Sequence, residues 1–215
     1  MIEIRNFGIC GATTRRILDD EVPAALAFRP ELTILLVGTN NTCNSHALTE
    51  MTVFRAELLA ILNAMKNVGS RLILMTIPPF CPELLLERHD RKAYGAFPPE
   101  ERVAAANRII AETAETASAV TVDLHAAFLT GELSGADSYL TNPANSEYRD
   151  GVHPNRRGYE RMAELLADAI RSHHLPCSRI ACLGDSITYG QYMAGAGTAT
   201  GDTYPGQLSS LLNRL

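Results

Sequence analysis

RIACLGDSIT, residues 179–188, joins an apolar run to a short polar turn. Residues 180–183 are all apolar, without the alternation of polar and apolar positions that a half-exposed strand shows. The run therefore predicts a parallel strand that is buried on both faces, with Gly184 and Asp185 at its end. Ligands of open α/β sheets bind beyond the carboxyl ends of the strands. We therefore expect Ser186 at the rim of the sheet, entering a helical turn with its backbone N–H available to an anion.

Similar runs recur along the chain and alternate with helical patterns. The other predicted strands cover residues 2–5, 32–37, 71–77 and 120–124. Residues 49–68 and 155–172 carry apolar side chains at helical spacing, and a further helix is expected over residues 204–215. This alternation predicts an α/β fold, a three-layer α/β/α sandwich whose parallel sheet is covered by helices on both faces.

The composition is that of one globular domain covering residues 1–215. Hydrophobic residues make up 46% of the chain and charged residues 20%, so a single large core can form. The formal net charge of -5 leaves no basic stripe for phosphates, and nucleic acid is not an expected partner. No apolar run approaches the roughly 18 residues of a membrane span, and residues 1–10 lack the features of a secretory signal. We expect a soluble, cytoplasmic protein.

The five cysteines are odd in number and widely spaced, without a C-x-x-C pair. This pattern indicates reduced thiols rather than a disulfide framework or a zinc ribbon. The residues that could suggest a metal site are His173, His174, Cys177 and Cys182. Cys182, however, belongs to the predicted buried strand, so its thiol is expected in the core. No metal or other cofactor is predicted.

Two segments carry few helix or strand signals. Residues 78–99 contain five prolines, and residues 191–202 are mostly small. Long irregular segments of a compact domain are usually lids or binding loops, and plain surface loops are the alternative.

A second polar cluster, Asp150-Gly-Val-His-Pro154, directly precedes the predicted helix 155–172. A neutral imidazole can take the proton of a serine hydroxyl, and a carboxylate three residues upstream can hold the other ring nitrogen. Read alone, the cluster could equally be a capping Asp150 and an exposed His153, just as Ser186 could be only a helix N-cap.

Two glycine-containing turns follow the first two predicted strands, at residues 6–14 and 37–41. A glycine lets a backbone N–H approach a substrate oxygen closely, and an asparagine amide supplies a second neutral donor. Together these are the parts of an oxyanion hole, with Gly11 and Asn40 as the candidate donors. Alone, each segment reads as a turn.

Taken together, the four segments resemble the four sequence blocks of the SGNH, or GDSL-type, serine hydrolases. The resemblance implies that Ser186 is the nucleophile and that His153 and Asp150 complete a catalytic triad. It also implies that the oxyanion is bound by the N–H groups of Ser186 and Gly11 and by the Asn40 side chain.

The sequence departs from the family pattern at two positions. The family usually has an aspartate after the asparagine of the third block, where this chain has Asn41, and this puts in question how that loop is held. Ala12 stands where the second block often has an aspartate, so one capping contact is expected to be missing.

The order of the blocks also differs from the family, because Ser186 follows His153 along the chain. A cyclic shift restores the usual order if residues 178–215 correspond to the family's N-terminal segment. We therefore interpret the chain as circularly permuted, with donation of this segment between chains as a domain swap as the alternative.

The family resemblance implies a five-stranded parallel sheet, flavodoxin-like, with the order 2-1-3-4-5 in unpermuted numbering. In this chain the strand 179–183 should then be central, flanked by the strands that begin near Ile2 and Leu32. Met1 and Leu215 should lie close in space, as the termini of tolerated permutants do.

Other polar residues are weaker candidates for a role in the site. His46, His89 and His125 have no acid partner at a motif spacing, so at most a substrate contact is expected from them. Cys10 lies beside Gly11, but no base is placed for it, and a small packed thiol is expected.

The resemblance implies a serine esterase that works through an acyl-enzyme without a cofactor. Family members act on carbohydrate O-acetyl groups, lysophospholipids, aryl esters and thioesters. Residues 193–197 offer little apolar wall for a long chain, which favours short, acetyl-type esters of small molecules or carbohydrates. The alternatives are a lysophospholipase or thioesterase, an acyltransferase with the same triad, and a non-catalytic carbohydrate-binding module. The last would be expected to have lost the serine or the histidine.

Overall fold

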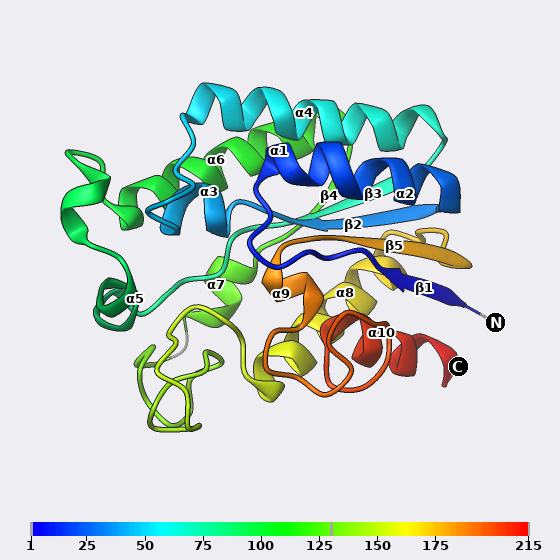
Figure 1. Ribbon diagram of the computed structural model, residues 1–215. Helices are drawn as coiled ribbons and strands as arrows, with labels where there is room; N and C mark the ends of the chain where they lie inside the picture. The colour runs from blue at the N-terminus through cyan, green and yellow to red at the C-terminus, as the bar shows by residue number, and fades with distance from the viewer. Residues whose placement is uncertain (1, 130, 215) are drawn as a thin grey trace.

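A five-stranded parallel sheet forms the centre of the computed structural model, which describes residues 2–129 and 131–214 (Figure 1). The strands are β1 (Glu3–Asn6), β2 (Leu32–Leu36), β3 (Arg71–Met75), β4 (Val120–Val122) and β5 (Arg179–Gly184). Their order in the sheet is β1-β5-β2-β3-β4, and each neighbouring pair is parallel. The predicted α/β class and the parallel sheet are confirmed.

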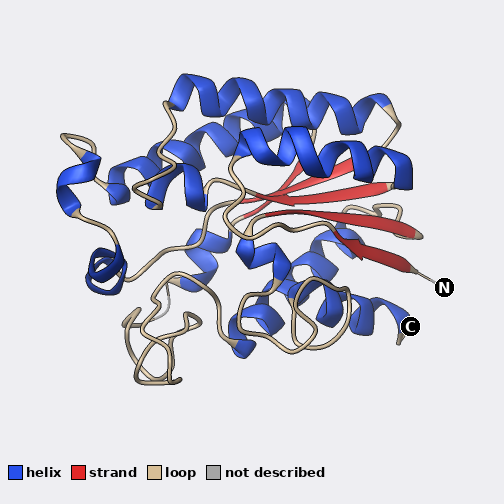
Figure 2. Cartoon of the chain, viewed as in Figure 1, coloured by secondary structure: helices blue, strands red, loops and turns tan. Residues whose placement is uncertain are grey.

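Helices cover both faces of this sheet (Figure 2). One layer contains α1 (Thr14–Arg16), the π-helical turn η1 (Ile17–Glu21), α2 (Val22–Phe28), α3 (Thr39–Cys43), α4 (Met51–Asn67) and α6 (Pro99–Ala117). The opposite layer contains α7 (Leu124–Phe128), α8 (Arg156–Ser172), α9 (Ser186–Tyr189) and α10 (Tyr204–Asn213). The remaining elements, α5 (Pro82–Arg88) and the 3-10 turn η2 (Arg91–Tyr94), connect β3 to α6. The three-layer sandwich is therefore confirmed.

The strand β5 shows why an apolar run without alternation predicts a buried strand. Ala181 and Leu183 contribute to the apolar core on the α4 side of the sheet, and Ile180 and Cys182 to the core on the α8 side. All four side chains are fully buried. Burying an Ile- or Leu-sized side chain contributes roughly 1.5–3 kcal/mol, so both faces of the strand are fixed by packing. The expectation that Cys182 lies in the core is confirmed.

The predicted elements differ from the observed ones mainly at their ends. Both β3 and β4 stop two residues before their predicted ends, at Met75 and Val122. After β4 the chain turns because the Asp123 side chain accepts a hydrogen bond from Ala126 N and caps α7. α8 begins after Asn155, which is its N-cap rather than its first residue.

The sequence predicts an irregular loop over residues 78–99. The structure shows instead that this segment contains α5 and η2. Pro82 occupies the first turn of α5, where its missing N–H has no intrahelical partner to lose. Leu84 and Leu85 of this helix are buried. The prolines therefore start a helix here instead of preventing one, whereas residues 191–202 form turns without helix or strand, as predicted.

Although β5 is the last strand along the chain, it lies inside the sheet between β1 and β2. These are the flanking strands that the permuted block order predicts, while the middle strand of the five is β2. Met1 and Leu215 lie outside the described residues, but Ile2 N donates to Asn213 Oδ1 at 3.1 Å, so the chain returns close to its start. Within the chain, β5 pairs in parallel with β1 on one side and with β2 on the other.

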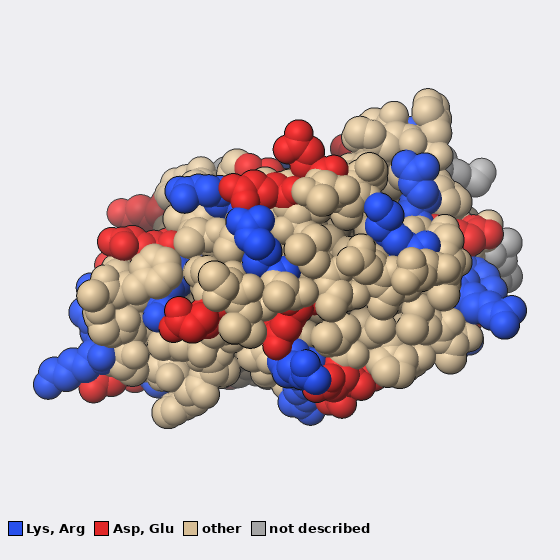
Figure 3. All heavy atoms as spheres, turned by 90° about the horizontal axis from the view of Figure 1, so that it is seen from above, with Lys and Arg blue, Asp and Glu red and all other residues tan. Residues whose placement is uncertain are grey.

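The outer face of the α1, α2 and α4 layer carries basic and acidic side chains in mixed groups (Figure 3). Ion pairs of this layer join Arg15 to Asp19, Arg16 to Asp20 and Arg55 to Glu112. The charges on this face therefore offset one another locally and form no continuous basic field there among the described residues. Within residues 2–129 and 131–214, no helix combines the length and apolar character needed to cross a bilayer.

Candidate active site

Ser186 is the first residue of α9 and directly follows the turn at the end of β5. The turn requires a glycine, because Gly184 has a φ of 155° and a Cβ there would lie 2.3 Å from the Leu36 carbonyl oxygen. The Asp185 side chain accepts a hydrogen bond from Ile187 N at 2.9 Å and caps α9. The sharp turn and its cap thus place the half-buried Ser186 at the carboxyl edge of the sheet.

His153 and Asp150 belong to one tight turn that precedes α8. Asp150 Oδ1 accepts hydrogen bonds from Val152 N at 2.8 Å and from His153 N at 2.6 Å. Gly151 has a φ of 73°, and a Cβ there would lie 2.7 Å from Leu84 Cβ. The short spacing of the motif therefore folds the Asp150 carboxylate back against the imidazole three residues later.

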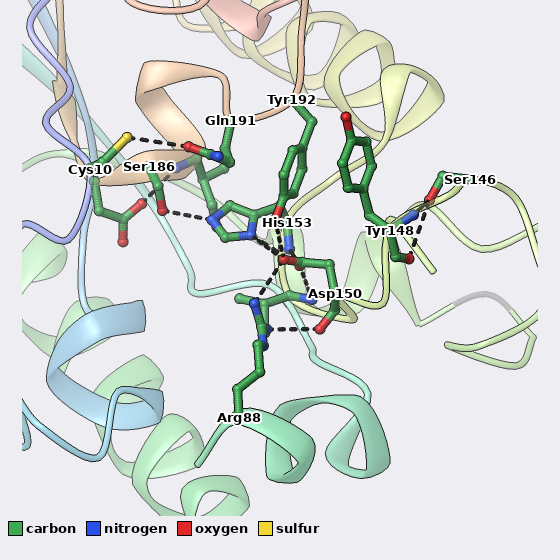
Figure 4. A network of polar contacts seen from close by, with 12 residues as sticks. Cys10, Arg88, Ser146, Tyr148, Asp150, His153, Ser186, Gln191 and Tyr192 are labelled. Atoms are coloured by element: carbon green, nitrogen blue, oxygen red, sulfur yellow. Dashed lines mark hydrogen bonds and ion pairs between the residues drawn. The ribbon is translucent and has the colours of Figure 1, made fainter. Parts of the chain in front are cut away.

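The Ser186 and His153 segments meet through a continuous line of hydrogen bonds (Figure 4). Ser186 Oγ lies 2.8 Å from His153 Nε2. On the other side of the ring, His153 Nδ1 lies 2.9 Å from Asp150 Oδ2 and 3.0 Å from Oδ1. An ionised carboxylate only accepts hydrogen bonds, so it favours the tautomer with the proton on Nδ1 and leaves Nε2 as an acceptor for the serine hydroxyl.

Asp150 has two further partners that the sequence motifs do not indicate. Arg88, at the end of α5, donates to Asp150 Oδ2 at 2.9 Å and to the Asp150 carbonyl oxygen at 2.8 Å. The Tyr192 hydroxyl donates to Asp150 Oδ2 at 3.1 Å. Burial and the neighbouring Asp150 charge raise the pKa of Tyr192 to about 12, so the phenol keeps the proton that it donates.

The Asp150 carboxylate stays charged although its side chain is only 1% exposed. Burial opposes ionisation of Asp150, but the hydrogen bonds from His153 and the charges of His153 and Arg88 outweigh it. Together they hold the pKa of the Asp150 carboxyl well below its usual range. The imidazole therefore faces a fixed negative charge at neutral pH.

A cavity of about 150 Å³ opens at Ser186 and His153, and Asn40 at the start of α3 lines it as well. Asn40 Nδ2 donates to the Ala12 carbonyl oxygen at 3.1 Å, which uses one of its two amide hydrogens and leaves the other for a ligand. Gly11, with a φ of 77°, lies in the exposed turn beside Ala12 and does not itself line this cavity. The structure therefore brings Asn40 to the serine and the histidine and leaves Gly11 in the adjoining turn.

Comparison with protein families finds a match to the model of the GDSL-like lipase/acylhydrolase family over residues 2–161, most of the chain. The chain belongs to this family. As a member of a family of acylhydrolases, it is a carboxylic ester hydrolase. No curated protein sequence matches the chain.

Several solved structures of GDSL-like hydrolases and other esterases have a similar fold. A GDSL-like lipase from Bacteroides thetaiotaomicron superposes with a TM-score of 0.58 and 21% identity, covering 76% of this chain and 73% of that one. An acetyl xylan esterase gives a TM-score of 0.55 and 20% identity, with 77% and 78% covered. An esterase from Pseudoalteromonas sp. gives 0.53 and 15% identity, with 76% and 74% covered. At these identities the likeness shows the fold alone.

In this GDSL-like chain, Asn41 holds the loop of Asn40 although it replaces the usual aspartate of the family. Its side chain is fully buried. Asn41 Oδ1 accepts a hydrogen bond from Thr14 N at 3.2 Å, and Nδ2 donates to the hydroxyls of Thr14 at 3.0 Å and Thr49 at 2.9 Å. An amide donates and accepts at once, which an ionised carboxylate cannot do, so a different set of hydrogen bonds fixes the loop. Ala12, at the second departure, packs in the core.

Cys10 is exposed and not packed, contrary to the sequence-based expectation, and its Sγ lies 3.4 Å from Gln191 Oε1. Partial burial of the sulfur and the nearby Asp185 charge raise the pKa of the Cys10 thiol, which makes it a weak nucleophile. His89, to which no definite role is assigned from sequence, lines the cavity at the serine, with Nδ1 2.9 Å from Ser45 Oγ. Burial lowers the pKa of His89, which favours its neutral form.

Two buried carboxyl groups lie beside the turn that carries Ser186. Glu21, at the end of η1, accepts a hydrogen bond from Gly184 N at 2.9 Å through Oε2, and its other oxygen is buried without a partner among the described residues. Burial raises the pKa of Glu21 to about 9 and that of Asp185 to about 6. Glu21 is therefore a neutral carboxylic acid at pH 7.

We expect Glu21→Gln to raise the melting temperature at pH 8.5 by at least about 3 °C and to change it little at pH 4.5. The folded pKa of about 9 lies above the ordinary value of 4.5, so the unfolded chain loses this proton first. The contribution of Glu21 to stability is therefore fully present below pH 4.5 and is lost as the pH rises through about 9. Glutamine keeps an acceptor for Gly184 N and cannot ionise.

Thermal unfolding followed by circular dichroism at both pH values measures the shift, with the exposed Glu115→Gln as control. Equal shifts at the two pH values would contradict the burial of a neutral acid.

Proposed function

We propose that this protein hydrolyses short-acyl carboxylic esters, with Ser186 as nucleophile, His153 as general base and Asp150 as the residue that orients the histidine. The unbroken line of hydrogen bonds from Ser186 Oγ through the imidazole to the buried carboxylate, beside a cavity, carries this proposal. Such a line is the arrangement in which a serine hydroxyl can lose its proton as it attacks a carbonyl carbon.

In the first half of the reaction, His153 Nε2 takes the proton of Ser186 Oγ while the oxygen forms a bond to the ester carbonyl carbon. The carbonyl oxygen becomes an oxyanion, and the proposed donors to it are the Asn40 amide and the Ser186 N–H, which line the cavity, with the Gly11 N–H of the adjoining turn as a third. When the tetrahedral intermediate collapses, the C–O bond to the alcohol breaks and His153 returns the proton to the departing oxygen. Water then repeats the sequence on the acyl-enzyme and releases the acid.

The hydrogen bonds that Arg88 and Tyr192 donate to Asp150 fit this mechanism. Imidazolium forms transiently at His153, and a carboxylate that stays ionised and fixed stabilises it. Because both oxygens of Asp150 accept several hydrogen bonds, the carboxylate cannot turn away from the ring. We infer that Arg88 and Tyr192 are positioning residues for the proposed triad.

The size of the cavity at Ser186 supports a short acyl group. Its volume is about 150 Å³, and polar side chains, including Asn44 and His89, share its lining with Leu85. The preference for short esters therefore rests on the small volume of this cavity. Met193 belongs to the segment that favoured short esters in the sequence, but it lines a different cavity. One protein of similar fold is an acetyl xylan esterase, and acetyl is a short acyl group.

A panel of p-nitrophenyl esters tests this proposal, because the leaving group stays the same while the acyl chain grows. We expect kcat/KM to be highest between acetyl and butyryl and to fall by about tenfold or more at octanoyl, as extra methylenes no longer fit. A maximum at octanoyl or longer would contradict the short-acyl proposal, and hydrolysis of none of the esters would contradict the esterase itself.

Replacement of Asn40 by alanine tests the oxyanion site. We expect kcat to fall by about 10²- to 10³-fold, as the loss of one oxyanion donor does elsewhere, with little change in KM. The exposed Asn213→Ala provides a control for the loss of an amide far from the cavity. An unchanged kcat in Asn40→Ala would remove this residue from the proposed site.

We also propose that the blocks stand in circularly permuted order. The interior position of β5 between β1 and β2 supports this, because it is the order that the family resemblance implies for a permuted chain. The family match over residues 2–161 also includes Gly11, Asn40 and His153 but stops before Ser186. A permuted chain would give such a match, since the family's first block would then follow its last.

A further inference from the structure

Asn44, the residue that ends α3, contacts the side chain of Asn40, the proposed donor to the oxyanion. Its Nδ2 donates to Asn40 Oδ1 at 3.4 Å. We propose that Asn44 is a positioning residue of the oxyanion site, which fixes the Asn40 amide so that an N–H and not the carbonyl oxygen faces the substrate. The inference rests on the proposed function, in which Asn40 donates to the oxyanion.

The Asn40 amide can serve an oxyanion in only one of its two orientations. If it turned over about its last side-chain bond, its own oxygen would take the place of the NH₂ group and would repel the negative charge. This torsion of asparagine is broad and has two nearly equivalent settings, so the residue alone does not select between them. A donor that is already oriented before the reaction needs no reorganisation when the charge develops.

Two backbone groups of fixed polarity determine how the amides of Asn40 and Asn44 lie. The Ala12 carbonyl oxygen can only accept, so the Asn40 group that faces it at 3.1 Å is Nδ2. The His46 N–H can only donate, so the Asn44 group that faces it at 3.0 Å is Oδ1. The remaining halves, Asn44 Nδ2 and Asn40 Oδ1, are then matched as donor and acceptor.

These contacts form one directed line of hydrogen bonds, from His46 N through Asn44 and Asn40 to the Ala12 carbonyl oxygen. Hydrogen bonds that run in the same direction along such a chain strengthen one another. Asn40 Nδ2 has a second hydrogen, which Ala12 does not use. That hydrogen is available at the cavity of about 150 Å³ that Asn40 and Asn44 both line beside Ser186.

The backbone around Asn44 is held in place by contacts from outside α3. Residues 40 and 44 are four apart, the spacing at which side chains on one helical face meet. On one side of Asn44, the Tyr94 hydroxyl donates to the Cys43 carbonyl oxygen. On the other side, Ser45 N donates to His89 Nδ1 at 3.4 Å, and the Ser45 hydroxyl lies 2.9 Å from the same nitrogen. The half-buried Asn44 thus projects from a fixed segment.

Two neutral replacements of Asn44 test the proposal with p-nitrophenyl acetate. Leucine is similar in size but neither donates nor accepts, and it adopts the extended backbone of this position, with φ -86° and ψ 108°, without strain. Serine can still accept from His46 N, which preserves the turn, but its hydroxyl is too short to reach Asn40.

We expect kcat to fall roughly threefold to tenfold in both Asn44→Leu and Asn44→Ser, the effect of losing one orienting hydrogen bond. KM should change by less than about twofold, because the oxyanion exists only in the transition state and the intermediate. Asn213→Leu, at an exposed asparagine, is the matched control and should retain wild-type kcat. A wild-type kcat in either Asn44 variant would overturn the proposal, and in Asn44→Ser it would assign the residue to the turn alone.

A double-mutant cycle with Asn40→Ala separates positioning from other roles of Asn44. With no amide left to orient, Asn44→Leu and Asn44→Ser should each change kcat by less than about twofold in this background. All rates are corrected for the rate of Ser186→Ala. A loss as large as in the wild-type background would show that Asn44 acts on the substrate or on the fold and not through Asn40, and would overturn the proposal.

The same measurements distinguish failure of this inference from failure of the proposed function. If Asn40→Ala keeps the kcat of an active wild-type protein, the oxyanion role of Asn40 is wrong and the role of Asn44 with it, while the esterase stands. If the wild-type protein hydrolyses no ester, the proposed function itself is wrong.

Discussion

Ser186→Ala is expected to lower kcat for p-nitrophenyl acetate by about 10⁴- to 10⁶-fold while the protein stays folded. The hydroxyl is the group that would bond to the carbonyl carbon, and its oxygen lies 2.8 Å from His153 Nε2. The residual rate would come from binding and from the oxyanion donors alone. Steady-state kinetics with the purified variant measures the loss, and thermal unfolding verifies the fold.

Ser210→Ala is the matched control, because Ser210 is an exposed serine on α10 whose hydroxyl only contacts the carbonyl of Gly206. It should retain wild-type kcat. If Ser186→Ala keeps more than about a tenth of the wild-type rate, the loss is far too small for a removed nucleophile and the assignment of Ser186 is wrong.

Asp150→Asn is expected to cost about 10⁴-fold in kcat. The carboxylate accepts hydrogen bonds from His153, Arg88 and Tyr192 at both oxygens, whereas an amide has only one accepting oxygen. The NH₂ group of the asparagine would face donors from these same residues and could not accept their hydrogen bonds. The imidazole would lose both its fixed tautomer and the charge that stabilises its protonated form. KM should change far less than kcat, because the group contacts the histidine and not the ester.

The exposed Asp168→Asn, on the outer face of α8, is the control for removing a carboxylate elsewhere. An Asp150→Asn variant with kcat within about tenfold of wild type would show that the carboxylate does not orient the base. Circular dichroism of this variant is required, because Arg88 would lose a buried partner and the turn at residues 150–153 could loosen.

The sheet was predictable because its strands have a local signature. The run at residues 180–183 is apolar on both sides of the backbone, and the structure places alternate residues in the two cores. α5 was not predictable in the same way. Its prolines indicated an irregular segment, and only burial of Leu84 and Leu85 against the rest of the fold turns the same residues into a helix.

The proposed triad was accessible from sequence for a related reason. Asp150 and His153 are three residues apart in one turn, so their contact is local and the motif encodes it. Arg88 and Tyr192 contact the same carboxylate from 62 and 42 residues away along the chain. No sequence motif joins either residue to Asp150, so neither contact could be predicted. Their role follows only from the way α5 and the loop after α9 pack around the turn.

The most direct test of the account is covalent labelling with p-nitrophenyl ethylphosphonate, whose phosphorus takes the place of the ester carbonyl carbon. Mass spectrometry of the digested protein should find one ethylphosphonyl group per chain, on the peptide that contains Ser186, together with loss of esterase activity. Ser186→Ala should take up none. A label on Cys10, or full inactivation with Ser186 unmodified, would contradict the assignment of Ser186 as the nucleophile.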